Sequence, residues 1–217
     1  MIRAVLAWLT SRGERRRRRK RRQWEARGRP NTPPSSIKHE IIRECARRFG
    51  LAVFVETGTY HGGTVVAMKH AFRRLYTVEL DAELALRAHR RFARDGRVTV
   101  YQGDSARVLP TILARLTEPA LFWLDAHYSG PGTARGSPDR PITQELDAIL
   151  AHPVRGHVVL IDDTRCFGVL PDYPTLADLE AFVRARDQAP AFEVRDDVIR
   201  IYPPRSLPTG RRVGSGS

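Results

Sequence analysis

The chain has few of the residues that stabilise small secreted proteins or anchor a protein in a membrane. Its 217 residues include only two cysteines, Cys45 and Cys166. These offer neither a disulfide framework nor a paired metal-binding spacing, which favours a reducing compartment. No apolar run approaches the ~20 residues that are needed to span a bilayer. The length suits one domain with a substantial core.

Lysine is scarce, and most of the chain lacks an excess of positive charge. The three lysines lie at positions 20, 38 and 69, although the formal net charge is +13. Residues 1–30 carry twelve Lys or Arg against two acids, and three arginines lie near the C-terminus, so residues 31–203 are neutral. A nucleic-acid-binding domain is expected to carry a basic stripe. The distribution therefore argues against such a face on the domain itself.

Residues 1–35 are interpreted as an appended basic arm, helical in part. A short apolar piece is followed by eight consecutive basic residues, Arg15 to Arg22, and by a Pro-rich break. This order is the reverse of a secretory signal, so we expect no export. The arm suits an anionic membrane surface or RNA phosphates, and a solvated extension is the third alternative. We expect a cytoplasmic protein, with a peripheral position at the inner face of the membrane as an alternative.

Strand-like and helical segments alternate after the arm. The expected strands are 51–56, 75–80, 97–102, 120–125 and 156–162. The expected helices are 63–74, 82–94, 105–116, 142–151 and 175–186, with an earlier helix to about residue 48 that Ser35-Ser36 would cap and Gly50 would end. Such alternation predicts an α/β fold, in which helices cover both faces of a parallel sheet.

The end of the domain departs from this alternation. Two short strand-like segments flank Asp196-Asp197, which predicts a terminal hairpin. Five strand–helix units and a hairpin match the Rossmann-like, seven-stranded methyltransferase sheet, mostly parallel, rather than the six parallel strands of a dehydrogenase. We expect this domain to span residues 36–203 and to be followed by a disordered tail at 204–217.

The turn after the first strand carries the strongest cofactor signal. It reads Glu56-Thr57-Gly58-Thr59-Tyr60-His61-Gly62-Gly63-Thr64, and further acids end the next strands at Glu79, Asp104 and Asp125. Ligands of such sheets bind beyond the carboxyl ends of the strands. Four acidic strand ends in register therefore predict an S-adenosylmethionine (SAM) site.

Each part of this set has an expected role. Gly58 lets the backbone approach the ligand, and the N–H groups after Gly62 face the SAM carboxylate. Glu79 would accept the ribose hydroxyls, and Asp104 would meet the adenine edge. The predicted cofactor residues are Glu56, Gly58, Tyr60, Gly62, Thr64, Glu79, Asp104, Ser105 and Asp125.

Two alternatives stand beside the SAM site. A dinucleotide site would need G-x-G-x-x-G, whereas this turn spaces its glycines G-x-x-x-G-G. The acids could also be helix caps in ordinary turns.

A second acidic cluster is predicted where the fourth and fifth strands end. Asp125 and the pair Asp162-Asp163 converge at one edge of the sheet if these strands are neighbours. Both members of the pair can turn inward only if the strand has already ended at Asp162. Clustered carboxylates repel unless a cation neutralises them, and oxygen ligands favour Mg²⁺. The alternative is that one aspartate caps the next turn while Arg165 pairs with the other.

The loop after Asp125 carries the candidate catalytic residues. His127 is the candidate general base, although a lone histidine is often structural, and Asp125 is the second catalytic candidate. Tyr128 and Arg165 are weaker candidates for placing the substrate, and His61 is expected to pack against ligand or loop. The Gly/Pro-rich residues 128–141 suit a lid.

Four segments resemble class I SAM-dependent methyltransferases, near the macrocin-type sugar O-methyltransferases and cephalosporin-hydroxylase-like proteins. They are Glu56–Tyr60, Gly103–Ser105, Trp123–Gly130 and Ile161–Asp163, within a resemblance that covers residues 50–203. The resemblance implies SAM at Glu56, Gly58, Glu79 and Asp104 and, by analogy with the sugar enzymes, Mg²⁺ at Asp125, Asp162 and Asp163. The turn lacks the commoner G-x-G, and the chain is shorter than the sugar enzymes.

The sequence therefore predicts a SAM-dependent O-methyltransferase that acts on a sugar or another small hydroxyl acceptor, with Mg²⁺ as a second candidate cofactor. RNA methylation, with the arm as the binding element, is one alternative. A non-catalytic adaptor built on the same fold is another.

Overall fold

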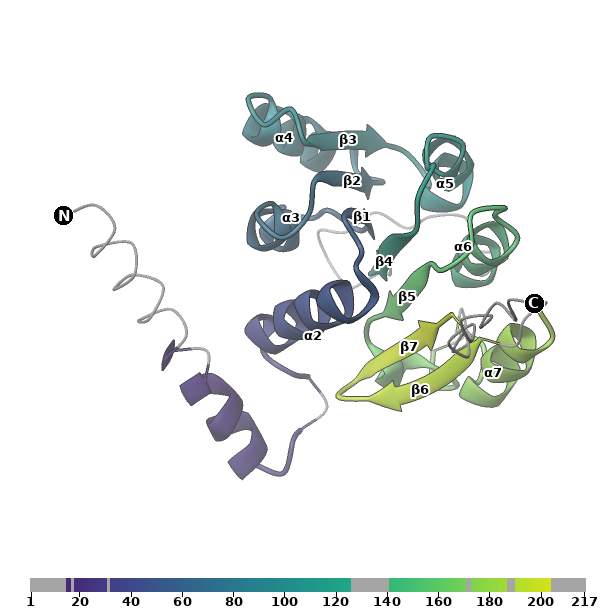
Figure 1. The fold of residues 1–217 in the computed structure, drawn as a ribbon. Coiled ribbons are helices and arrows are strands. Elements are labelled where there is room, and N and C mark those ends of the chain that lie inside the picture. The colour runs from purple at the N-terminus through teal and green to yellow at the C-terminus, as the bar shows by residue number, and fades with distance from the viewer. Residues whose placement is uncertain are drawn as a thin grey trace, which may run out of the picture.

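The structure, a computed structural model, describes residues 15–16, 18–30, 32–125, 141–170, 173–186 and 190–203. One seven-stranded sheet organises them, in the order β3-β2-β1-β4-β5-β7-β6 (Figure 1). Its strands are β1 (Val53–Thr57), β2 (Arg74–Glu79), β3 (Val98–Gln102), β4 (Ala120–Leu124), β5 (Val158–Ile161), β6 (Ala191–Arg195) and β7 (Val198–Tyr202). The first five run parallel, and β7 pairs antiparallel with both β5 and β6. The predicted sheet and terminal hairpin are confirmed.

Helices cover both faces of the sheet, as predicted. They are α2 (Ser35–Phe49), α3 (Gly63–Met68), α4 (Ala82–Phe92), α5 (Ser105–Leu113), α6 (Pro141–Leu150) and α7 (Leu176–Arg184), with a short 3-10 helix η1 (Thr164–Cys166). Figure 1 shows α2, α3 and α4 on one face and α5, α6 and α7 on the other, and the core correspondingly forms two clusters. Every residue of β1, β4 and β5 is buried, which explains why these strands read as continuous apolar runs.

Two details of the helices differ from the sequence-based expectation. Pro34, rather than a serine, takes the N-cap position of α2, and no side chain caps this end, whereas Gly50 ends the helix in the left-handed conformation as predicted. The helix expected over 63–74 stops at Met68. By Arg73 the backbone N–H already donates to Ala52 O at 2.8 Å, because the chain has turned to begin β2.

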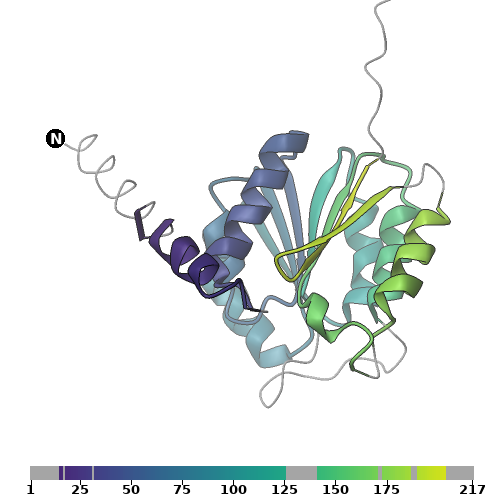
Figure 2. The same cartoon turned by 90° about the horizontal axis from the view of Figure 1, so that it is seen from below.

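The described part of the basic arm packs onto the domain. Residues 18–26 are helical, and Figure 2 shows this purple helix alongside α2. Trp24 is 6 % exposed and belongs to the same apolar cluster as Ile37 and Ile41 of α2. Its indole Nε1 donates to Pro30 O at 2.9 Å, and Arg21 pairs with Glu40 at 3.0 Å. The buried Trp24 ring and the Arg21–Glu40 pair thus hold this strongly basic helix against α2.

Trp24→Ala is expected to release this helix from the domain. Loss of the buried indole removes apolar contact with α2 and leaves a cavity, which we expect to lower the free energy of unfolding by about 3 kcal/mol. Limited proteolysis should then cut within residues 18–30 much faster than in the wild type. Arg22→Ala is the matched control, since Arg22 is exposed on the same helix. Equal cleavage rates for the two variants would contradict the anchoring role.

Within the described residues, none of the helices combines the length and the apolar character required to cross a membrane. The predicted tail at 204–217 lies outside the described residues.

Candidate active site

The turn after β1 brings backbone to the carboxyl edge of the sheet. Gly58 has φ +88°, a backbone conformation that residues with a side chain rarely adopt. The N–H groups of Gly58 and Thr59 both donate to Val78 O, at 2.9 and 3.1 Å, so the turn is fastened to β2. The Gly58 backbone is therefore held next to the end of the second strand, as a cofactor cradle of this fold requires.

Glu79 lies at the centre of this edge. Its side chain is buried with 7 % exposure, and its two oxygens accept from separate backbone groups, Tyr60 N at 2.6 Å and Asp81 N at 3.0 Å. A carboxylate has about four acceptor sites, so capacity for two hydroxyls remains. Tyr60, at φ +47°, is half exposed beside it, with its ring centroid 4.0 Å from that of His61.

Glu56 is the most buried acid of the turn and has a different environment. The Thr77 hydroxyl donates to it at 2.9 Å, and the Thr59 hydroxyl is 2.5 Å from that of Thr77. Burial raises the pKa of Glu56 to about 8, although hydrogen bonds from Thr77 and Thr64 oppose the shift. Glu56 is therefore protonated at neutral pH, and it orients the hydroxyls of Thr77 and Thr59, which join β2 to the turn after β1.

Gly62 provides a test of how closely this turn is packed. It has φ +70°, and an added Cβ would lie 2.8 Å from the buried Phe92 ring. Gly62→Ala should therefore lower the free energy of unfolding by about 3 kcal/mol, through backbone strain and the clash together. Gly63→Ala is the matched control, since nothing lies within 4 Å of its added Cβ. Denaturant titration compares the two, and equal stabilities would contradict the packing argument.

Asp104 and Ser105 lie where the adenine is expected. Asp104 is the N-cap of α5, and one oxygen of its carboxylate accepts from Ala106 N at 3.0 Å. The alternative that these acids cap helices therefore holds for this oxygen of Asp104. Ser105 is buried. Behind it lies a residue that the sequence reasoning missed, Glu145 of α6, which is 1 % exposed. Burial raises the pKa of Glu145 to about 7, partly opposed by the nearby hydroxyls of Ser105 and Thr57.

A group of carboxylates, here named the carboxylate rim, lies at the ends of β4 and β5. It comprises Asp125, Asp162, Asp163 and Asp197. β5 ends at Ile161, and Asp163 adopts φ +58°. This reversal turns both aspartates of the pair to one side, as the predicted strand end requires. Oxygens of Asp162, Asp163 and Asp197 lie within 4.8 Å of one another.

The electrostatics of the rim reflect crowding of like charges. Burial, followed by repulsion from Asp162 and Asp163, raises the pKa of Asp125 well above its ordinary value. Burial raises the pKa of Asp162 to about 6, and the attraction of Lys38 opposes this shift. Asp125 is therefore close enough to be repelled by Asp162 and Asp163. It does not belong to the group of three carboxylates whose oxygens converge, Asp162, Asp163 and Asp197.

Two side-chain cations are bound to the rim. Lys38 Nζ lies 2.5 Å from Asp162 Oδ2 and 3.4 Å from Asp163 Oδ1. The Arg165 guanidinium pairs with Asp163 Oδ1 at 2.9 Å and also with Asp197. The predicted pairing of Arg165 with one aspartate is thus present. The oxygens suit Mg²⁺ by their chemistry, but those of the pair already hold Lys38, so a divalent ion fits only if the ammonium moves away.

Three residues of this site were not among those chosen from the sequence. Lys38 is one of three lysines in an arginine-rich chain, which is the signal that could have identified it. Asp197 was interpreted only as a turn residue, and Glu145 only as part of the helix expected over 142–151. Conversely, His127, Tyr128 and most of the predicted lid at 128–141 lie outside the described residues, and their expected roles stay predictions.

Comparison with solved structures defines the class of fold. The chain has the fold of the class I SAM-dependent methyltransferases. The O-methyltransferase TomG from Streptomyces achromogenes, involved in tomaymycin synthesis and solved with SAM, is 19 % identical, with a TM-score of 0.57 over 80 % of this chain and 83 % of that one. The resemblance found in the sequence is confirmed at the level of the fold.

Two further solved structures share it. The O-methyltransferase from Bacillus cereus, in complex with SAH, the demethylated form of SAM, is 15 % identical, with a TM-score of 0.56 over 86 % of this chain and 90 % of that chain. The methyltransferase PaMTH1 of Podospora anserina, also bound to SAH, is 15 % identical, with a TM-score of 0.56 over 86 % and 85 % of the two chains.

Sequence comparison reaches a shorter part of the chain. The ribosomal RNA small subunit methyltransferase A of Acidobacterium capsulatum is 39 % identical over 80 residues, which are 37 % of this chain and 28 % of that protein. The match therefore spans under a third of the relative's length. No family model matches the chain.

Proposed function

We propose that the protein is a SAM-dependent O-methyltransferase that acts on a sugar or another small hydroxyl acceptor. The observation that carries this proposal is Glu79, a buried carboxylate held by two backbone N–H groups at the carboxyl end of β2, beside the Gly58 turn. In this fold such an acid faces the ligand crevice. The O-methyltransferases and SAM or SAH complexes among the structural neighbours support the same activity.

The arrangement suggests how the residues divide the work. Bound SAM supplies an electrophilic methyl group on a positively charged sulfur. Glu79 binds the ribose, Asp104 and Ser105 orient the adenine, and the Gly58 backbone makes room for the ligand. Asp125, which follows β4, is proposed to lie on the acceptor side of the site. His127 is proposed to take the acceptor proton as the new C–O bond forms.

Mg²⁺ assistance, the finer part of the prediction, is not needed for these roles. If the ion took part, Asp125, Asp162 and Asp163 would be its ligands, on the chemistry of their oxygens. No step above passes through the ion, because Lys38 already binds two of the three.

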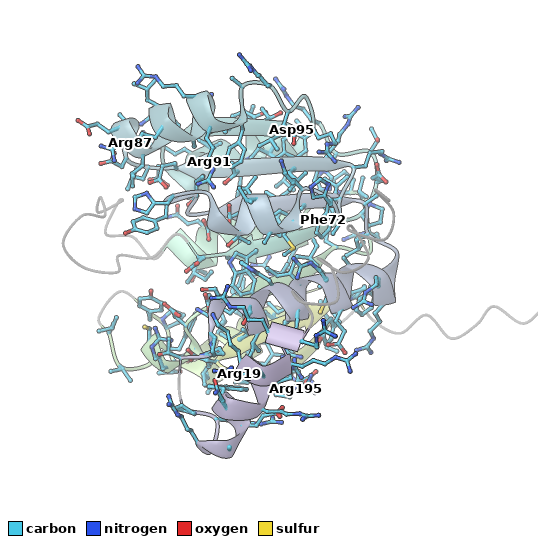
Figure 3. The ribbon with its side chains drawn as sticks, turned by 90° about the vertical axis from the view of Figure 1, so that its left-hand side faces the viewer. Arg19, Phe72, Arg87, Arg91, Asp95 and Arg195 are labelled. Atoms are coloured by element: carbon cyan, nitrogen blue, oxygen red, sulfur yellow. The ribbon has the colours of Figure 1, made fainter. Side chains whose placement is uncertain are left out.

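RNA methylation is a second candidate, favoured by the match to the ribosomal RNA enzyme and by the basic helix. Figure 3 shows Arg19 of this helix, Arg87 and Arg91 of α4 and Arg195 of β6 on one side of the molecule. Phosphate contacts of this kind are strongly salt-dependent. Titration of RNA into the full chain at several salt concentrations tests this candidate, and weak, salt-independent binding would contradict it. The same titration with anionic liposomes tests peripheral membrane binding.

Calorimetric titration of SAM and SAH into the full chain, with and without Mg²⁺, tests the main proposal. We expect micromolar affinity, which should fall about tenfold in Asp104→Ala, where one charge-assisted hydrogen bond is lost. Asp104→Asn is the companion variant, because asparagine retains the cap of α5. A panel of saccharide and phenolic acceptors then reports methyl transfer. Absence of SAM binding in the folded protein would favour the adaptor alternative.

A further inference from the structure

The cation at the carboxylate rim comes from a helix that is remote in sequence. Lys38 lies in the first turns of α2, while its two partners follow β5 more than 120 residues later. The Lys38 side chain is 17 % exposed and that of Asp162 is 1 % exposed. Burial lowers the pKa of Lys38, but attraction to Asp162 and Asp163 outweighs this and raises it overall, so the ammonium is fully charged.

The position of Lys38 is fixed by packing rather than by the ion pairs alone. Its neighbour Ile37 is 1 % exposed, and Ile41, one turn further, is 2 % exposed. The helix contacts β4 and β5, across which it lies in Figure 1. A helix anchored on both sides of Lys38 holds its backbone in one place, from which the side chain reaches both carboxylates.

The opposing carboxylates are equally constrained. Asp162 Oδ1 accepts from Asp163 N at 2.8 Å, which directs Oδ2 toward Lys38. The Arg165 backbone N donates to Asp197 Oδ1 at 3.0 Å, and its guanidinium bridges Asp163 and Asp197. The rim therefore already contains a hydrogen-bonded network with two positive charges. Such pairs are strong when the geometry is held by neighbouring contacts.

We infer that the Lys38 ammonium is the resident cation of the carboxylate rim and occupies the position that a divalent metal ion would otherwise take. A hexahydrated or partly dehydrated divalent ion needs several of the same oxygens, and it would be repelled by an ammonium 2.5 Å from one of them. The inference deepens the proposed function: if the protein transfers methyl groups from SAM, this reaction proceeds without a divalent metal. Its catalytic consequence therefore rests on the proposed function. The binding test below does not depend on that activity.

Manganese binding to the full chain, followed by electron paramagnetic resonance, tests the inference directly. We expect wild-type protein to bind Mn²⁺ with a dissociation constant no tighter than about 1 mM, since a carboxylate pair neutralised by an ammonium is a poor site. Lys38→Met, which keeps most of the side-chain length without the charge, should bind at least about tenfold tighter. Adding Asp163→Asn to Lys38→Met should abolish the gain.

Two controls separate this effect from a general change of charge or fold. Lys38→Arg keeps the charge and should bind Mn²⁺ no better than the wild type. Lys69→Met removes a lysine whose partner is Asp95 at 3.8 Å, away from the rim, and should also leave binding unchanged. Lys38→Gln is the second variant if Lys38→Met fails to fold.

The outcomes decide the question whichever variants fold. Micromolar Mn²⁺ binding to the wild type would overturn the inference, and so would a folded Lys38→Met or Lys38→Gln that binds no tighter than the wild type. Failure of the proposed function has a different signature: SAM does not bind, while Mn²⁺ affinity still increases when Lys38 is replaced.

Discussion

Glu79→Gln should weaken SAM binding about 100-fold while leaving the protein folded. The carboxylate is expected to accept both ribose hydroxyls, and two hydrogen bonds to a charged acceptor together contribute about 3 kcal/mol, which corresponds to this factor. The amide has the same shape, but one of its acceptor oxygens becomes a donor that faces backbone N–H groups of Tyr60 or Asp81. Calorimetry with SAM measures the loss.

The matched control for this prediction is Glu83→Gln. Glu83 lies four residues further along, in the first turn of α4, and its side chain is 83 % exposed. The chemical change is identical, so SAM affinity should match that of the wild type. If the two variants bind SAM equally well and have the melting temperature of the wild type, Glu79 only holds the turn at Tyr60 in place. The assignment of Glu79 to the ribose would then be wrong.

Glu145→Gln should become more stable relative to the wild type as the pH rises. The pKa of Glu145 is raised to about 7 by burial, from an ordinary value of 4.5. Between these pH values the unfolded chain ionises this group while the folded chain keeps it protonated. The wild type therefore loses stability with rising pH across that window, by about 3 kcal/mol in total, and glutamine removes this loss.

Chemical denaturation at a series of pH values from 4 to 8 measures this difference. Two half-buried histidines, His39 and His157, have pKa values lowered to about 4 by desolvation, and their contribution to stability rises with pH between 4 and 6.5. It is common to both proteins and cancels in the difference. A stability difference between Glu145→Gln and the wild type that stays constant across this pH range would contradict the raised pKa of Glu145.

The fold was largely predictable because its signals are local. Apolar runs such as Val53–Val55 are buried on both faces of the sheet, and Asp196-Asp197, at φ +56° and +59°, form the tight turn that their residue types favour. Helix ends were less predictable. After α3 ends at Met68 the chain turns back, and the Arg73 N–H donates to Ala52 O, just before β1, which is a contact remote in sequence. No periodicity within 63–74 contains that information.

The site was predictable only where function coincides with a strand end. Glu79 and Asp162 follow directly from counting strands. Lys38 and Glu145 reach the site from helices, and their relation to it is set by how α2 and α6 pack on the sheet. The 2.5 Å contact between Lys38 and Asp162 joins residues more than 120 positions apart. Such a contact depends on tertiary packing, which the spacing of residues in the sequence does not reveal.

The order of the strands also has a consequence for biosynthesis. β7, which follows β1 to β6 in the chain, lies inside the sheet between β5 and β6, and the turn before it supplies Asp197 to the rim. The elements that carry Glu56, Glu79 and Asp104 are complete once about half the chain has been made. A nascent chain could therefore assemble the residues proposed to bind SAM early, whereas the carboxylate rim is completed only after translation of the turn between β6 and β7. Premature termination before Asp197 would leave a protein with an unpaired β5 edge and Arg165 without its Asp197 partner.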